Sequence, residues 1–97
     1  MKRNAFKSSV TGQSPSEKLP KPLIALWWQK KGNWDKAHAI IQTDKTGHGA
    51  WVHALLHREE EGDLANASYW YSRANRIMPE ETIENEWELI ISELLDQ

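Results

Sequence analysis

Apolar residues recur along much of this chain at intervals of three and four residues, the spacing that places side chains on one face of a helix. The pattern is clear at Trp51, Val52, Leu55 and Leu56. It returns near the carboxyl end at Ile83, Trp87, Ile90 or Ile91, and Leu94. We therefore expect an all-α protein of about five helices, near residues 23–31, 34–44, 49–61, 64–77 and 80–96.

Glycine and proline mark the turns between these predicted helices. Gly62 follows a helical stretch and can adopt the left-handed conformation that closes a helix. Asp63 is a favourable N-cap, so we expect its carboxylate to accept hydrogen bonds from the free amides of the next helix. Pro79 cannot continue a helix and is well suited to start the following one. The segment 49–77 is thus predicted to be an antiparallel helical hairpin.

The order of residues from Trp51 to Pro79 resembles one tetratricopeptide unit. The matching positions are Trp51, Gly62, Asp63, Ala67, Tyr71, Ala74 and Pro79. Leu55 and Arg58 depart from the pattern, because that family usually has Gly and Tyr there. The run from Ala67 to Ala74 is also similar to the Ala-x-x-Trp-Tyr-x-x-Ala run of Sel-like repeats, so both families stay open.

A weaker copy of the same pattern precedes this unit. Shifting the chain by thirty residues places Gly32 on Gly62 and Ala37 on Ala67. The resemblance implies antiparallel hairpins stacked as a short α-solenoid over residues 23–79, with a C-terminal capping helix. Members of these families mostly act as protein-interaction scaffolds, so it also implies a protein or peptide partner. An unrelated amphipathic hairpin closed by Gly would align in the same way, and this alternative stays open.

Charge divides the chain into unlike parts. Residues 1–22 contain five basic residues and one acid, and are otherwise rich in small polar residues and Pro. This composition predicts a flexible basic arm, with residues 23–97 as the helical-repeat domain. From Glu80 onward the chain has acidic residues and no basic ones. The last helix should therefore have an acidic outer face.

Composition argues against several classes of protein. The longest apolar run, residues 23–28, is far shorter than the roughly 20 residues that cross a bilayer, and the amino terminus lacks the apolar segment of a signal peptide. We therefore expect a cytoplasmic protein without a membrane partner. Cysteine is absent, which excludes disulfides and thiolate metal sites. Outside the arm the charge is negative and would repel phosphate, so we do not expect a nucleic-acid partner.

The six tryptophans are the unusual feature of the composition. Most should pack in the core, because burying an aromatic ring removes about 150–250 Å² from water. Trp27 and Trp28 point about 100° apart on a helix, so one of them should be exposed. We predict a partner-binding groove formed by Trp27, Lys31, Val52, His53 and Leu56. Because small domains have thin cores, a homodimer is a further hypothesis.

Histidine is the residue type that suggests chemistry. His53 and His57 are separated by four residues, a spacing that lets two imidazoles on one helix share a metal ion. The apolar residues of that helix indicate a different face, so we expect both histidines on its wetter side, with metal binding as the alternative. Ala54 occupies the position of the glutamate in a zinc-hydrolase helix. We expect neither an enzyme nor a cofactor.

Overall fold

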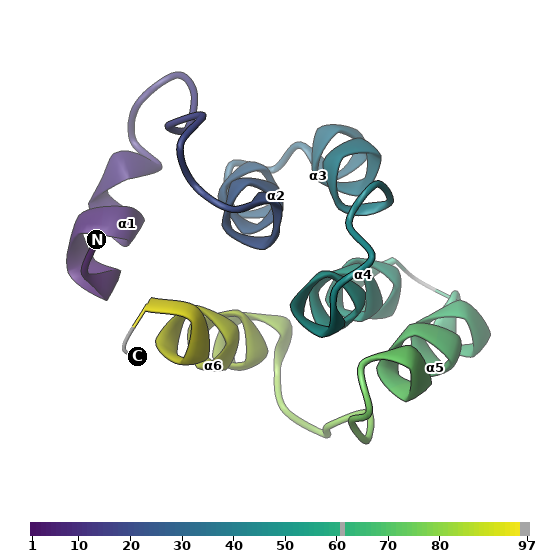
Figure 1. Ribbon diagram of the computed structural model, residues 1–97. Coiled ribbons are helices and arrows are strands. Elements are labelled where there is room, and N and C mark those ends of the chain that lie inside the picture. The colour runs from purple at the N-terminus through teal and green to yellow at the C-terminus, as the bar shows by residue number, and fades with distance from the viewer. Residues whose placement is uncertain (61, 96–97) are drawn as a thin grey trace.

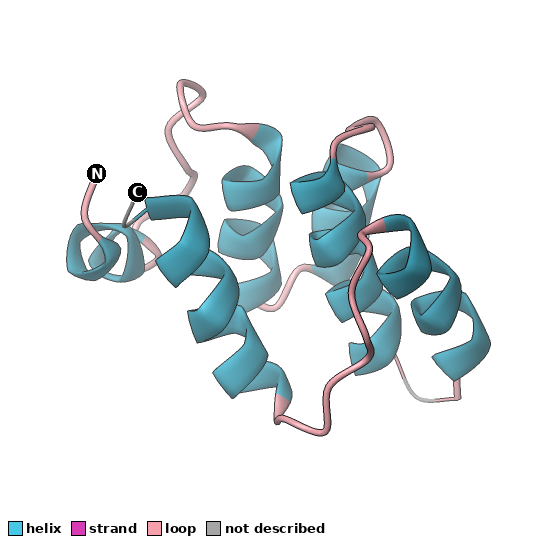
Figure 2. Ribbon diagram, turned by 60° about the horizontal axis from the view of Figure 1, so that its bottom comes forward, coloured by secondary structure: helices cyan, strands magenta, loops and turns pink. Residues whose placement is uncertain are grey.

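The computed structural model describes residues 1–60 and 62–95, and this part of the chain contains six helices and no strand (Figure 1). They are α1 (Arg3–Ser9), α2 (Lys21–Lys30), α3 (Trp34–Ile41), α4 (Gly47–Glu59), α5 (Leu64–Arg73) and α6 (Ile83–Leu95). Figure 2 shows the loops that join them. The all-α class expected from the sequence is confirmed. None of the helices in these residues is long and apolar enough to span a bilayer.

Two tight turns pair α2 with α3 and α4 with α5 as packed hairpins. Gly32 and Gly62 lie in these turns with φ angles of 91° and 82°, which residues with a Cβ rarely adopt. The left-handed conformation expected for Gly62 is confirmed. Asn33 caps α3, because its side-chain oxygen accepts from the backbone N–H of Lys36 at 3.1 Å. The further stacking of hairpins as a repeat solenoid stays a prediction.

Helix α4 is the centre of the molecule and contacts α2, α3, α5 and α6 (Figure 1). Every residue from Gly49 to His57 is buried. A surface helix has one apolar stripe and one wet face, whereas this one is enclosed on all sides over that range. The position of α4 decides the environment of the histidines it carries.

The amino-terminal segment differs from the flexible arm expected from its composition. Helix α1 lies against α6, and Phe6 is fully buried with its ring 5.9 Å from that of Trp87. The indole Nε1 of Trp27 donates to Ser9 Oγ at 3.1 Å. One buried aromatic side chain, Phe6, therefore anchors this basic segment on the helical domain. The mainly polar composition of the segment did not indicate this contact.

The connection between α5 and α6 is longer than predicted. Helix α5 ends at Arg73 because Asn75 adopts a φ of 60° and the backbone N–H of Arg76 donates to the carbonyl of Tyr71 at 2.9 Å. Helix α6 begins after Thr82, whose Oγ1 accepts from the backbone N–H of Asn85 at 3.0 Å. Residues 74–82 thus form an extended connection, and Pro79 lies within it.

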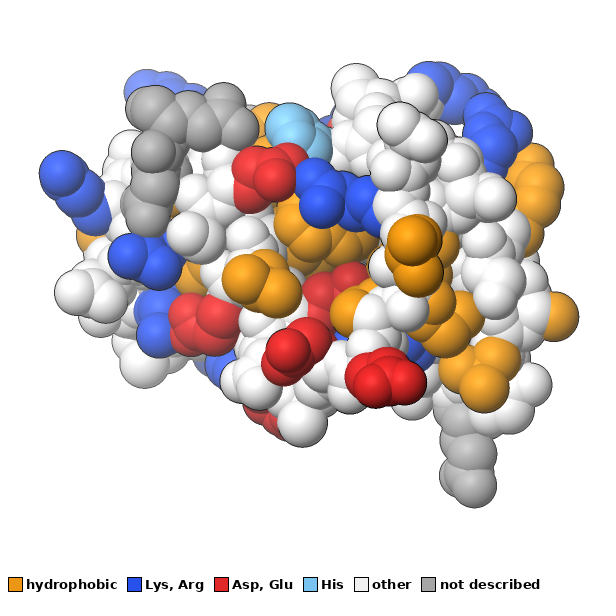
Figure 3. All heavy atoms as spheres, turned by 90° about the horizontal axis from the view of Figure 1, so that it is seen from below, with side chains coloured by type: hydrophobic (Ala, Val, Ile, Leu, Met, Phe, Trp, Pro, Cys, Tyr) orange, Lys and Arg blue, Asp and Glu red, His pale blue; other side chains and the backbone are white. Residues whose placement is uncertain are grey.

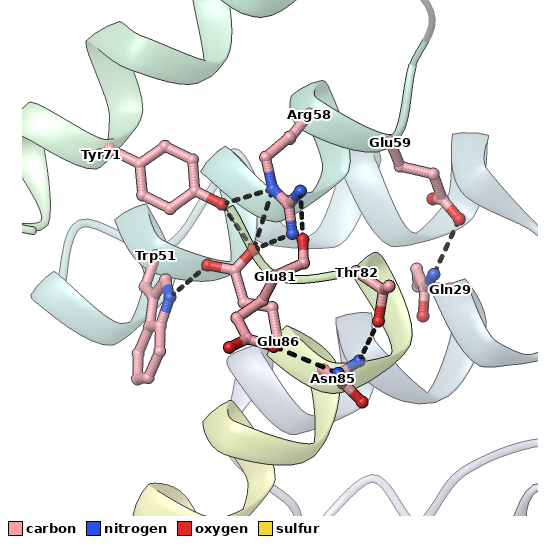
Figure 4. A network of polar contacts seen from close by, with 9 residues as sticks. All are labelled: Gln29, Trp51, Arg58, Glu59, Tyr71, Glu81, Thr82, Asn85 and Glu86. Atoms are coloured by element: carbon pink, nitrogen blue, oxygen red, sulfur yellow. Dashed lines mark hydrogen bonds and ion pairs between the residues drawn. The ribbon is translucent and has the colours of Figure 1, made fainter. Parts of the chain in front are cut away.

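Glu86 on α6 is 1% exposed, and a carboxylate in such a place is unfavourable unless its oxygens accept hydrogen bonds. Its Oε2 accepts from Trp51 Nε1 at 3.0 Å. Its Oε1 accepts from the hydroxyl of Tyr71 at 2.5 Å and from the guanidinium of Arg58 at 2.9 Å (Figure 4). Burial and this carboxylate raise the pKa of Tyr71, so its hydroxyl remains a donor. The network ties α6 to α4 and α5.

Replacing Phe6 tests whether α1 belongs to the domain. Phe6→Ala should lower the free energy of unfolding by about 3 kcal/mol, because it empties a buried site between α1 and α6. Urea unfolding followed by tryptophan fluorescence measures the change. Asn4→Ala, on the exposed side of the same helix, is the control and should unfold like the wild type. Equal midpoints for the two variants would contradict the packing of Phe6.

Removing Arg58 from the Glu86 network should lower the free energy of unfolding more than removing Arg58 and the charge of Glu86 together. Arg58→Met leaves the buried carboxylate without a cation and should reduce stability by about 3 kcal/mol. Adding Glu86→Gln to the same chain removes the uncompensated charge and should restore part of the loss. Thermal unfolding of the single and double variants compares them. A double variant less stable than Arg58→Met would show that the charge is not the cause.

Candidate metal centre

Three imidazoles meet where α3 packs against α4. His38 comes from α3, and His53 and His57 come from successive turns of α4. One ring nitrogen from each lies within 4.8 Å of the others, and the Nε2 atoms of His38 and His53 are 3.2 Å apart. The four-residue spacing places two imidazoles on one side of α4. Helix α3, which forms a hairpin with α2, supplies the third imidazole, His38.

The expectation that His53 and His57 lie on a wet face is wrong. They are 4% and 6% exposed, because α3 and α5 both pack on the side of α4 from which these rings project. His38 is half-buried at the edge of the cluster. Apolar periodicity indicates one buried face of a helix, but it cannot reveal that neighbouring elements cover the other.

Two tryptophans fix the orientation of the rings. Trp70 of α5 stacks on His53, with ring centroids 3.8 Å apart and an interplanar angle of 11°. Trp34 of α3 stacks on His38 at 4.8 Å and 9°. The indole Nε1 of Trp34 donates to the carbonyl of Leu56 at 2.8 Å, which holds that ring in place. The imidazoles are thus confined between flat aromatic walls.

Asp63 bonds to the cluster rather than to the helix that follows it. Its Oδ2 accepts from His57 Nδ1 at 2.7 Å, and a carboxylate oxygen of Glu60 lies 3.7 Å from the same nitrogen. No side-chain hydrogen bond caps α5, so the predicted N-cap role of Asp63 is wrong. A proton on Nδ1 of His57 leaves Nε2 with the free lone pair. Histidine ligands in metal sites are commonly oriented by a carboxylate in this way.

Burial favours the neutral form of His38 and His53. Desolvation, followed by the repulsion of His38 and His57, lowers the pKa of His53 from 6.5 to about 4. Desolvation and then the proximity of His57 also lower the pKa of His38. Since only a neutral imidazole has a lone pair for a metal, both rings are in the ligating form at neutral pH without losing a proton.

The spacing of the rings suits a small divalent ion. Two nitrogens that bind one tetrahedral zinc at about 2.0–2.1 Å lie roughly 3.3 Å apart. The 3.2 Å between the Nε2 atoms of His38 and His53 is close to this value, and the His57 nitrogen, within 4.8 Å of both, would have to move closer to bind the same ion. Without metal the same pair forms a hydrogen bond, in which one ring donates and the other accepts. For both Nε2 atoms to bind an ion, the donating ring has to change tautomer and carry its proton on Nδ1.

Sequence reasoning missed two members of this cluster. His38 stands fifteen residues before His53 and on another helix, and the only signal was the gathering of histidines between residues 38 and 57. Asp63 was recognised from the sequence, but as an N-cap and not as a hydrogen-bond partner of His57. The remaining histidine of that gathering, His48, lies elsewhere, with Nε2 3.1 Å from Glu93 Oε2.

The residues predicted to line a partner-binding groove do not share a surface. Trp27, Val52 and Leu56 are completely buried, so the expected exposed anchor at Trp27 is wrong. His53 belongs to the imidazole cluster. Lys31 is exposed, but its Nζ donates to the carbonyls of Val10 and Gly12 and so fastens the amino-terminal segment. These residues therefore make contacts within the domain and do not form one exposed groove.

Compared with known family models, curated proteins and solved structures, the chain matches none.

The buried imidazoles make the fold sensitive to acid. Between pH 6.5 and about 4 the unfolded chain protonates His53 while the folded chain does not, so the free energy of unfolding falls as the pH is lowered. We expect this residue to account for about 3 kcal/mol of loss across that window, with no further loss below it. Urea unfolding of wild type and His53→Gln at several pH values measures the slopes. Parallel slopes would contradict the burial of a neutral ring.

Proposed function

We propose that this chain binds one divalent transition-metal ion through His38, His53 and His57. The observation that carries the proposal is the meeting of three imidazole nitrogens within 4.8 Å at one buried point. Imidazole ligands suit zinc, copper and nickel, and three of them are a common protein contribution to a zinc site. We take Zn²⁺ as the ion to test first.

The surroundings support a ligand role more than a purely packing role. A core needs no second histidine 3.2 Å from the first, whereas a metal site needs neutral rings held at this separation. The bond from His57 Nδ1 to Asp63 orients the third ring and favours the tautomer with a free Nε2. Trp34 and Trp70 limit the rotation of the other two. A bound ion would join α3 to α4 and stabilise both hairpins together.

The hairpin resemblance supports a second proposal, that the domain also acts as a protein-interaction module. The pairing of α2 with α3 and of α4 with α5 favours it. The anchors expected from sequence are buried, so such a surface has to use other residues. The imidazole cluster is the more specific geometry, and we give it precedence.

Calorimetric titration of the metal-free protein with Zn²⁺ at neutral pH tests the site. The wild type should bind one ion with a dissociation constant of about 1 μM or below, and His38→Ala or His53→Ala should weaken binding at least about 100-fold. Asp63→Asn should weaken it by about 10–100-fold, because it removes the orienting carboxylate. Circular dichroism checks that each variant is folded.

His48→Ala is the matched control for this titration. It removes the same side chain from the start of α4, outside the cluster, and should bind zinc like the wild type. Because Trp70 stacks on His53, binding should also change tryptophan fluorescence. If His48→Ala lost affinity as much as His53→Ala, or if the wild type bound no ion, the proposed centre would be wrong.

A further inference from the structure

A second feature of the surface is a hollow between α6 and the connection that precedes it. Its volume is about 390 Å³, and it is lined by Trp51, Asn75, Arg76, Ile77, Pro79, Glu86 and Leu89. Figure 3 shows hydrophobic side chains gathered around a hollow on this face. None of the imidazole ligands or their tryptophan walls lines it. We call it the α6 groove.

The floor of the α6 groove is rigid. The ring of Trp51 is 5% exposed, and its Nε1 is held by the buried carboxylate of Glu86 (Figure 4). The guanidinium of Arg76 lies over this ring, 3.4 Å from its centroid, and also bonds Glu93 at 2.7 Å. A floor that is already ordered, here the Trp51 ring with the Arg76 guanidinium over it, loses little conformational entropy when a ligand covers it.

An apolar knob stands directly beside this hollow. Ile77 is 92% exposed, the highest value among the large hydrophobic side chains that the described residues leave exposed. The left-handed Asn75 turns the chain just before it. Leu89 on the opposite wall is 53% exposed. Knob and hollow therefore belong to one continuous surface of the same chain.

The charges along the connection are arranged so that the segment complements itself. Arg76, which is paired with Glu93 of its own chain, precedes Ile77, and the acids Glu80 and Glu81 follow Pro79; these three charged side chains are exposed. In an antiparallel pair of such segments, the cationic end of one lies beside the acidic end of the other. A twofold axis produces this reversal.

We propose that the α6 groove is the interface of a symmetric homodimer, in which each Ile77 enters the hollow of the other copy. A twofold interface uses the same patch on both subunits, so it requires a projection and a matching cavity on one surface. The α6 groove supplies both, together with self-complementary charge. The occupant is therefore a second copy of this chain, and the contact closes as a pair rather than growing into a filament.

Sedimentation velocity over a wide concentration range, with a chelator present to exclude metal bridging, tests this proposal. The wild type should change from monomer to dimer with a dissociation constant of about 1–100 μM, as expected for a small interface. Ile77→Asp places a charge in the hollow and should weaken dimerisation at least about tenfold. Leu64→Asp is the matched control, since Leu64 is 54% exposed but does not line the groove, and it should dimerise like the wild type.

Cysteine pairing gives the geometry independently, because the chain has no cysteine of its own. Mixed under mild oxidation, Ile77→Cys and Leu89→Cys proteins should form a mixed disulfide faster than either forms one with Leu64→Cys. A wild type that stays monomeric throughout, as it would if the hollow served a different partner, overturns the proposal. So does an Ile77→Asp variant that dimerises normally, or pairing that is no faster than with Leu64→Cys.

Discussion

The structure depends on one buried carboxylate. Glu86 enters the interior from α6, and each of its oxygens is used by a donor from another helix: Trp51 and Arg58 of α4 and Tyr71 of α5. An ion buried in this way has to keep its donors, so the three helices can pack in few relative positions. Helix α4 is thereby enclosed on the α6 side, while α3 and α5 enclose it on the side of the imidazoles.

The candidate metal centre and the α6 groove share this construction. Trp51 forms part of the groove floor, whereas His53 and His57 lie further along the same helix and face α3 and α5. Helix α4 thus presents different side chains to two separate sites. Because each site rests on a helix with no exposed residue from Gly49 to His57, both have a rigid support. The polar network and the stacked rings constrain side chains that would otherwise be free to rotate.

Sequence pattern predicted helices α2 to α6 and the left-handed turn at Gly62, since local spacing and backbone conformation decide these features, but it did not predict α1. The pattern did not predict features that depend on contacts between helices. The buried ring of Phe6 outweighs the polar residues around it, and Asp63 bonds to His57 across the turn instead of capping its own helix. The apolar face of α4 was recognised, but the covering of its histidines depends on α3 and α5. His38 could be placed beside His53 only after the hairpins were packed together.

The contact between α1 and α6 has a consequence for how the chain acquires its structure. Within each hairpin the contacting residues are close in sequence, so α2 with α3 and α4 with α5 can pair by closing short loops. Phe6 and Trp87 are separated by most of the described chain. On a ribosome, Phe6 would be synthesised before Trp87 and could not pack on that indole until α6 emerged. Among the helix pairs that contact each other in the described residues, α1 and α6 are the farthest apart in sequence, so bringing them together costs more loop-closure entropy than closing either hairpin.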